Sequence, residues 1–163
     1  MNKKEKEHLP LMGVGPLCIA IMIAFTVAGI ALVKSGVLKS GNINIALPFI
    51  VLGVLCIAGG AALWVSAVIV CRIDIKIKSE RLETGGIYAH VRNPIYSAFL
   101  FICTGALLFC RNLYALVLPP LFWVYLTIFM KMTEEKWLAK CFGEEYFTYC
   151  KQVNRFIPWI RKR

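Results

Sequence analysis

The stretch PIYSAFLFICTGALLFCRNLYALVLPPLFWVYLTIFM, from Pro94 to Met130, decides the fold. It holds two uncharged runs of 17 and 18 residues, 94–110 and 113–130, which only Arg111 and Asn112 separate. Each run lies near the lower limit of about 17 residues for a membrane-spanning helix, so each alone also fits a buried helix of a soluble protein. Together, with so short a connection, they predict a helical hairpin that crosses a membrane and returns.

Two longer uncharged runs precede this hairpin. They cover 11–33, with 23 residues, and 45–71, with 27 residues. The first is longer than the apolar region of about 7–15 residues in a signal peptide and ends in no small-residue cleavage site, so we expect a span. Apolar residues make up 59% of the chain, whereas about half is usual in soluble domains. The sequence therefore predicts an all-α integral membrane bundle with four transmembrane helices.

The charge distribution predicts the orientation of these helices. The chain has 19 Lys and Arg against 9 Asp and Glu, a net charge of +10. If both termini are cytoplasmic, 16 of the basic residues lie on the cytoplasmic side and 3 on the other, as the positive-inside rule requires. Membrane topology thus accounts for the excess of basic over acidic residues, and we expect a lipid bilayer rather than nucleic acid as the partner.

The residues after the hairpin predict a cytoplasmic C-terminal amphipathic helix. Apolar and aromatic side chains recur at helical spacing between Glu134 and Val153, and Gly143 is a candidate break. Upstream, alternating residues 73–78 suggest either an extended segment at the interface or the frayed end of a long helix. We divide the chain into a two-span region, residues 1–72, and a core, residues 73–163, made of the interfacial loop, the hairpin and the C-terminal helix.

Three further patterns concern packing. Ala58, Ala62 and Ser66 recur every four residues beside Gly59 and Gly60, a spacing at which small residues let another helix approach closely. The pair Pro119-Pro120 predicts a kink in the fourth span. None of the seven cysteines forms a Cys-x-x-Cys pair, so we expect reduced, packed thiols and no metal site.

Polar residues gather where the hairpin begins, in the stretch TGGIYAHVRNPIY from Thr84 to Tyr96. Asn is a favoured N-cap residue and Pro suits the first helical position, so Asn93 and Pro94 predict the start of a helix. Folding the hairpin places Arg92 opposite about residue 131 at roughly 1.5 Å per residue, within about one helical turn of Glu134. This convergence fits either a salt bridge that holds the hairpin or a ligand site.

The stretches LETGGIYAHVRNPIYSAFL and EEKWLAKCFGEEYFTYCKQVNRFIPWI, with the hairpin between them, resemble the isoprenylcysteine carboxyl methyltransferase and phospholipid methyltransferase family of integral membrane enzymes. The resemblance covers about residues 71–160. It rests on the order of its parts: a Thr-x-Gly-x-Tyr turn, an Arg-Asn-Pro-x-Tyr helix start, an acidic pair, a Phe-Gly-x-x-Tyr motif and a late proline.

The resemblance implies an enzyme that uses S-adenosylmethionine, with Arg92 and Glu134 as its catalytic residues. Arg92 would meet the cofactor carboxylate, and Glu134 would accept hydrogen bonds from ribose hydroxyls or the amino group. Since the chain has no Gly-x-Gly-x-x-Gly motif, the cofactor would bind in a helix-bundle cleft. The family's cofactor contacts fall on Leu82, Glu83, Tyr88, Asn93, Pro94, Ile95, Tyr96 and Glu134.

The methyl acceptor and the oligomeric state stay open. Many relatives have His where this chain has Asn93, and eukaryotic carboxyl methyltransferases have an Arg where it has Met130. A prenylcysteine carboxylate, a phospholipid amine and another lipophilic molecule are therefore all candidates. Two other interpretations are a small non-enzymatic membrane assembly protein and a relative of the sterol reductases. The second is disfavoured because those reductases have many more spans.

Overall fold

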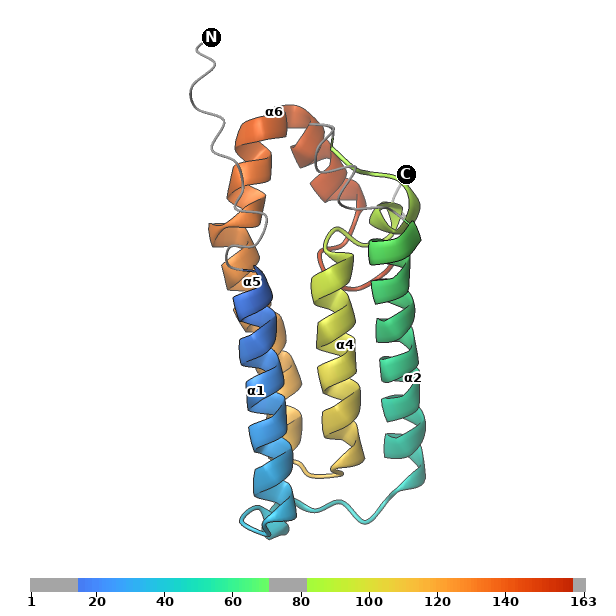
Figure 1. Cartoon of the computed structure of the whole chain (residues 1–163), viewed down its shortest axis with the longest axis vertical. Coiled ribbons are helices and arrows are strands. Elements are labelled where there is room, and N and C mark those ends of the chain that lie inside the picture. Colours follow the sequence, from blue (N-terminus) through green and yellow to red (C-terminus); the bar gives the residue numbers. More distant parts are fainter. Residues whose placement is uncertain (1–14, 71–81, 160–163) are drawn as a thin grey trace.

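The structure is a computed structural model that describes residues 15–70 and 82–159, and every regular element in these two ranges is helical (Figure 1). The long helices are α1 Gly15–Lys34, α2 Leu47–Val65, α4 Pro94–Phe109, α5 Leu118–Met132 and α6 Glu134–Gln152. Short turns are η1 Lys39–Gly41, η2 Ser66–Val70, η3 Gly86–Ala89 and η4 Ala115–Val117, of which η2 is π-helical. The predicted all-α class is confirmed.

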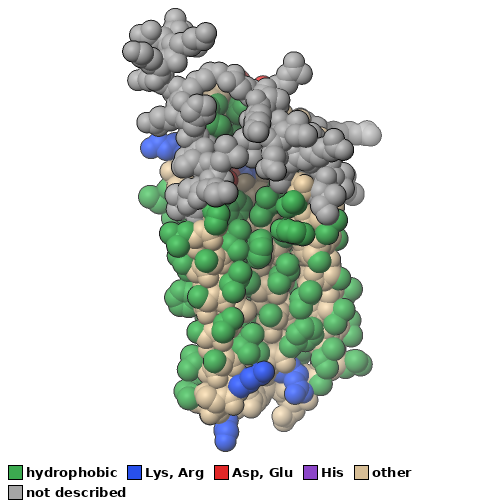
Figure 2. Space-filling model, in the orientation of Figure 1, with side chains coloured by type: hydrophobic (Ala, Val, Ile, Leu, Met, Phe, Trp, Pro, Cys, Tyr) green, Lys and Arg blue, Asp and Glu red, His purple; other side chains and the backbone are tan. Residues whose placement is uncertain are grey.

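Three of these helices are long and apolar enough to cross a membrane: α1, α2 with its extension to Val68, and the stretch from Ala115 to Met132. The fourth, α4, has 16 residues and is shorter than a usual span. Large apolar side chains stay exposed along these helices, and Figure 2 shows them covering the length of the bundle. Such an exposed apolar surface belongs in hydrocarbon, so the chain is a membrane protein.

The four apolar helices run alternately in opposite directions (Figure 1). α4 and α5 form the predicted hairpin, α2 lies beside α4, and α1 packs against α4 and α5. Buried side chains such as Met22, Leu107 and Leu126 form the core between α1, α4 and α5. α6 follows α5 directly and arches over the end of the bundle where α4 begins, which places the predicted polar residues under one cover.

At the opposite end, the buried side chain of Asn112 joins the hairpin turn to the loop after α1. Its Nδ2 donates to the Leu38 carbonyl at 2.7 Å and to Asn42 Oδ1 at 2.9 Å. Its Oδ1 accepts from the backbone N–H of Tyr114 at 3.0 Å. A buried polar side chain is stable only when it is hydrogen-bonded, so these contacts hold the hairpin turn against the loop after α1.

Close packing of α2 on α4 depends on glycines. A Cβ atom at Gly60 would lie 2.7 Å from the Ala98 carbonyl oxygen, and one at Gly105 would lie 2.7 Å from that of Gly53. The prediction of a small-residue packing face is therefore right for Gly60 but wrong for Ala58 and Ala62, which are exposed. The helix periodicity turns those alanines away from α4.

Two other expectations differ in outcome. Pro119 and Pro120 fall in the first turn of α5, where their missing N–H groups cost no hydrogen bond, so the predicted mid-span kink is wrong. The break in α6 is confirmed, because Gly143 has φ 51° and ψ −126°. The proposed extended segment 73–78 lies outside the described residues.

We predict that Gly60→Ala lowers the free energy of unfolding by about 1–3 kcal/mol, because the added methyl group meets α4 backbone that cannot move aside. The measurement is thermal unfolding in detergent. Gly59→Ala is the matched control, since a Cβ there meets nothing within 4 Å. Equal melting temperatures for both variants would contradict the packing account.

Candidate functional site

α4 starts at Asn93 and Pro94, as the sequence predicts. The hydrogen bonds that Asn93 makes there differ from those of a usual side-chain N-cap. Asn93 occupies the N-cap position and its carbonyl accepts from Ser97 N at 3.0 Å. Its side chain does not cap the helix; Nδ2 instead donates to the Arg155 carbonyl at 3.4 Å. Pro94 is buried at the first helical position. The helix start is therefore fixed partly by a segment more than 60 residues away.

Tyr96, in the first turn of α4, donates its phenolic O–H to Oε1 of Glu134, the first residue of α6. The first residue of α1 covers this pair so closely that a Cβ on Gly15 would lie 2.5 Å from the Tyr96 hydroxyl and 3.8 Å from Glu134 Oε1. Burial raises the pKa of Glu134, and the hydrogen bond from Tyr96 opposes that shift. The hairpin thus brings the start of α6 to the start of α4, where the partner of Glu134 is Tyr96.

Arg92 binds the neighbouring carboxylate. Its Nη1 lies 3.2 Å from Glu135 Oε1 and donates to the Cys150 thiol at 2.6 Å. Arg155 approaches the same carboxylate with both ends of its fork, Nε at 2.6 Å and Nη2 at 2.9 Å. This bidentate bond raises the pKa of Arg155. The sequence correctly predicts that Arg92 lies beside the acidic pair, but its ionic partner is Glu135.

This cluster has one more positive than negative charge. Two guanidinium groups share one carboxylate, and the side chains of Arg92 and Glu135 are only 11% and 13% exposed. In the part of the chain that the structure describes, Arg92 Nε is buried and has no hydrogen-bond partner. An unsatisfied buried donor of this kind is costly unless another acceptor completes it. The arrangement is therefore suited to an additional anionic group.

The C-terminal segment 154–159, which we call the tail, closes the cluster from one side. Arg92 N donates to the Asn154 carbonyl at 2.9 Å, and Asn93 N donates to that of Arg155 at 3.2 Å. Farther along, Trp159 N donates to the His90 carbonyl at 3.0 Å. The first two bonds pair the start of the tail with Arg92 and Asn93, and the third returns the end of the tail to His90. Together they hold Arg155 beside Glu135.

The remaining predicted residues make contacts with α6 or within their own segments. Leu82 packs on the cluster of Tyr146 and Tyr149 on α6. The carbonyl of Tyr88 accepts from the Tyr149 hydroxyl at 2.6 Å, which ties η3 to α6. Glu83 Oε1 accepts from the backbone N–H of Gly85 at 2.9 Å within its own loop. Ile95 is partly buried in the first turn of α4.

Arg155, Cys150 and Tyr149 are site residues that the sequence does not single out. Arg155 follows Glu135 by 20 residues with the Gly143 break between them, so helical spacing relates the two in no simple way. The only sequence signal is a lone arginine inside the apolar tail. Backbone pairing of the tail with residues 90–93 leaves no trace in side-chain periodicity.

Comparisons with known proteins find relatives over a large part of the chain, from α2 to the first half of α6. The profile of the family described as phospholipid methyltransferase matches residues 48–145. A protein-S-isoprenylcysteine O-methyltransferase of Schizosaccharomyces pombe is 38% identical over 88 residues, 51% of this chain and 35% of that protein. Protein-S-isoprenylcysteine O-methyltransferase B of Arabidopsis thaliana is 30% identical over 90 residues, 53% of this chain and 45% of its own length. The matches thus cover less than half of these curated relatives.

We predict that Glu135→Gln destabilises the protein by about 1–3 kcal/mol, because two largely buried guanidinium groups lose their shared anion. Thermal unfolding in detergent measures the effect. The control is Glu145→Gln on the exposed face of α6, where we expect no change. If both variants unfold at the wild-type temperature, the ion cluster does not stabilise the fold.

Proposed function

Because this chain belongs to the phospholipid methyltransferase family, we propose that it transfers a methyl group from S-adenosylmethionine to a lipophilic acceptor at the cytoplasmic membrane face. The observation that carries the proposal is that one end of the bundle holds both the Glu134 carboxylate, bound by Tyr96, and Arg92, whose buried Nε has no hydrogen-bond partner among the described residues. The site residues, the cofactor and the acceptor are all part of this proposal.

The residues present fit this cofactor. Arg92 has a donor that no described residue uses, and its cluster has an excess positive charge; the carboxylate of S-adenosylmethionine would complete both. Glu134 has the acceptor oxygens that ribose hydroxyls or the ammonium group would use. Tyr88 and Tyr96 offer aromatic faces for adenine or the sulfonium cation. The full set of proposed contacts is Leu82, Glu83, Tyr88, Arg92, Asn93, Pro94, Ile95, Tyr96 and Glu134.

The cofactor, when bound, supplies a methyl carbon already activated by the adjacent sulfonium. The work of the chain is to align the acceptor with that carbon and to exclude water. Arg92 would hold the cofactor carboxylate and Glu134 its ribose hydroxyls or ammonium group, while Tyr96 orients the Glu134 carboxylate. The cover formed by α6 and the tail keeps water from the reacting groups. None of these functions requires a proton transfer by the protein.

The structure favours an acceptor that needs no general base. An amine would have to lose a proton, and Glu135 is the neighbouring carboxylate that could take it. Both Glu135 oxygens, however, are already held by Arg155, and one by Arg92 as well. A carboxylate acceptor is nucleophilic without such help. Since the cited relatives are named for isoprenylcysteine, we propose a prenylcysteine carboxylate, with a phospholipid amine as the alternative.

The membrane arrangement is part of the proposal. α4 also crosses the membrane, as the third of four crossings in chain order, both termini are cytoplasmic, and α6 is an amphipathic helix on the cytoplasmic surface. Its apolar side, with Tyr146 and Tyr149 buried, faces the bundle. Residues 1–72 form the two-span region and residues 73–163 the methyltransferase core.

The test is incubation of the purified protein with methyl-labelled S-adenosylmethionine and either an S-farnesylcysteine derivative or phosphatidylethanolamine. Label in the methyl ester supports the proposal, and label in the phospholipid selects the alternative acceptor. Calorimetry with Arg92→Ala and Glu134→Gln tests the assigned contacts, with Glu145→Gln as the control. Full cofactor affinity in both site variants would remove their proposed functions, and absence of cofactor binding in the wild type would favour a non-enzymatic protein.

We predict that acidification weakens cofactor binding at a pH above the ordinary glutamate value of 4.5, because burial raises the pKa of Glu134. The ionised carboxylate accepts hydrogen bonds, and protonation removes that capacity as the pH falls through the raised pKa. The measurement is the dissociation constant at a series of pH values. Glu134→Gln is expected to bind weakly with no such pH dependence; an unchanged pH profile in this variant would assign the titration to another group.

A further inference from the structure

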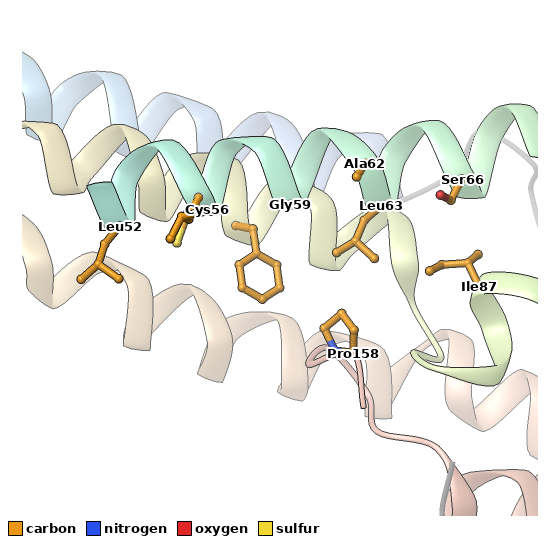
Figure 3. Close-up of a pocket in the computed structure, with 10 residues that line it drawn as sticks. Leu52, Cys56, Gly59, Ala62, Leu63, Ser66, Ile87 and Pro158 are labelled. Carbon is orange, nitrogen blue, oxygen red and sulfur yellow. The ribbon is translucent and has the colours of Figure 1, made fainter. Parts of the chain in front are cut away.

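Of the two helices that precede the polar stretch, α1 rather than α2 lies against the Tyr96–Glu134 hydrogen bond. The open side of α2 lines an apolar groove, to which Ile87 and Pro158 also contribute (Figure 3). Neither Tyr96 nor Glu134 is among the described residues that line this groove. α1, in contrast, starts beside the junction of α5 and α6 (Figure 1), where its first residue, Gly15, meets both members of the pair.

One face of α1 packs against the rest of the bundle along most of the helix. Its buried residues, Cys18, Met22, Thr26 and Gly29, follow one another at intervals of four, four and three residues, so they share a face of the helix. Gly15 precedes Cys18 by three residues and extends this face to the start of α1. The face packs on α4 and α5. The packing of the whole helix therefore determines how closely Gly15 approaches the proposed site.

Gly15 has no side chain at the point where this face meets the Tyr96–Glu134 pair. A Cβ atom there would lie 2.5 Å from the Tyr96 hydroxyl oxygen, so one of the two would have to move. It would lie 3.6 Å from Tyr96 Cζ and 3.8 Å from Glu134 Oε1, which are ordinary contacts. A helix does not need glycine in its first turn, and glycine loses more conformational freedom on folding than any other residue. Close approach to the Tyr96 hydroxyl therefore explains the glycine.

We propose that Gly15 is a positioning residue of the proposed site, an inference that rests on the proposed function. Because Gly15 leaves room for the Tyr96 hydroxyl, the first turn of α1 closes over the hydrogen bond from Tyr96 to Glu134. Tyr96 then holds the Glu134 carboxylate where the cofactor would meet it, and α1 keeps water from that side of the pair. α1 precedes residues 48–145, which the family profile matches, so this contribution comes from outside the matched region.

Gly29 provides a matched control on the same face of the same helix. A Cβ atom there would lie 2.9 Å from Leu118 Cδ1, so Gly29→Ala also crowds the end of one side chain. Leu118 is the first residue of α5 and lies at the end of the bundle opposite Glu134. The two alanine variants therefore disturb packing at opposite ends of α1, and only Gly15→Ala displaces a group of the proposed site.

The test is the dissociation constant for S-adenosylmethionine, measured by calorimetry. We expect Gly15→Ala to raise it roughly five- to twenty-fold, because Tyr96 is pushed away from Glu134, and Gly29→Ala to leave it unchanged. Tyr96→Phe should raise it to a similar extent, since it removes the same hydrogen bond. Adding Gly15→Ala to Tyr96→Phe should then change it by less than about twofold, because the phenyl ring lacks the oxygen that the new Cβ would meet.

A second measurement needs no cofactor. In thermal unfolding in detergent, Gly15→Ala should lower the melting temperature of the wild type but not that of Tyr96→Phe. Unchanged cofactor affinity in Gly15→Ala overturns the proposal, as does an equal effect of this substitution with and without Tyr96→Phe, or an equal loss of affinity in Gly29→Ala. If the wild type binds no cofactor, the proposed function fails, and the unfolding measurement still decides whether Gly15 positions Tyr96.

Discussion

The carboxylate of Glu135 is the interaction on which the functional end of the molecule depends. It joins the start of α6 to Arg92, before α4, and to Arg155 in the tail. Without that anion, two guanidinium groups would face each other in a largely buried place, where like charges repel strongly. Since Glu134 is its neighbour in the chain, the same ion cluster also fixes the carboxylate that Tyr96 binds. Charge balance therefore sets the geometry of the proposed cofactor site.

The two ends of the bundle are held by different forces, and the difference suits their functions. The hairpin turn is held by hydrogen bonds of the uncharged Asn112 side chain. The amide nitrogen and oxygen of this side chain both have partners within the protein. The end with α6 is held by ions, and one buried donor, Arg92 Nε, is left without a partner among the described residues. A closed, fully bonded end gives rigidity, whereas an incompletely bonded end is ready for a ligand.

Much of this arrangement follows from the sequence. The apolar runs, the hairpin and the Gly143 break are readable because hydrophobicity, chain length and glycine act locally. The approach of Arg92 to the acidic pair Glu134-Glu135 follows from simple hairpin geometry. The choice of Glu135 over Glu134 by Arg92 does not, since it depends on Arg155 and on backbone pairing of the tail. Likewise, small residues on α2 predict close approach without telling which face approaches α4 and which stays open.

The short length of α4 has a consequence for the surrounding bilayer. Its 16 residues extend about 24 Å, whereas the hydrocarbon core of a bilayer is about 30 Å thick. If α4 crosses the membrane, as proposed, it would draw the two surfaces of the bilayer together beside it, since a short helix thins the membrane locally. The headgroup layer at that end of the bundle would then dip toward the level of Arg92. A substrate anchored by its lipid tail would then reach the proposed site without leaving its leaflet. Local thinning of the bilayer would replace part of the movement that the substrate otherwise needs.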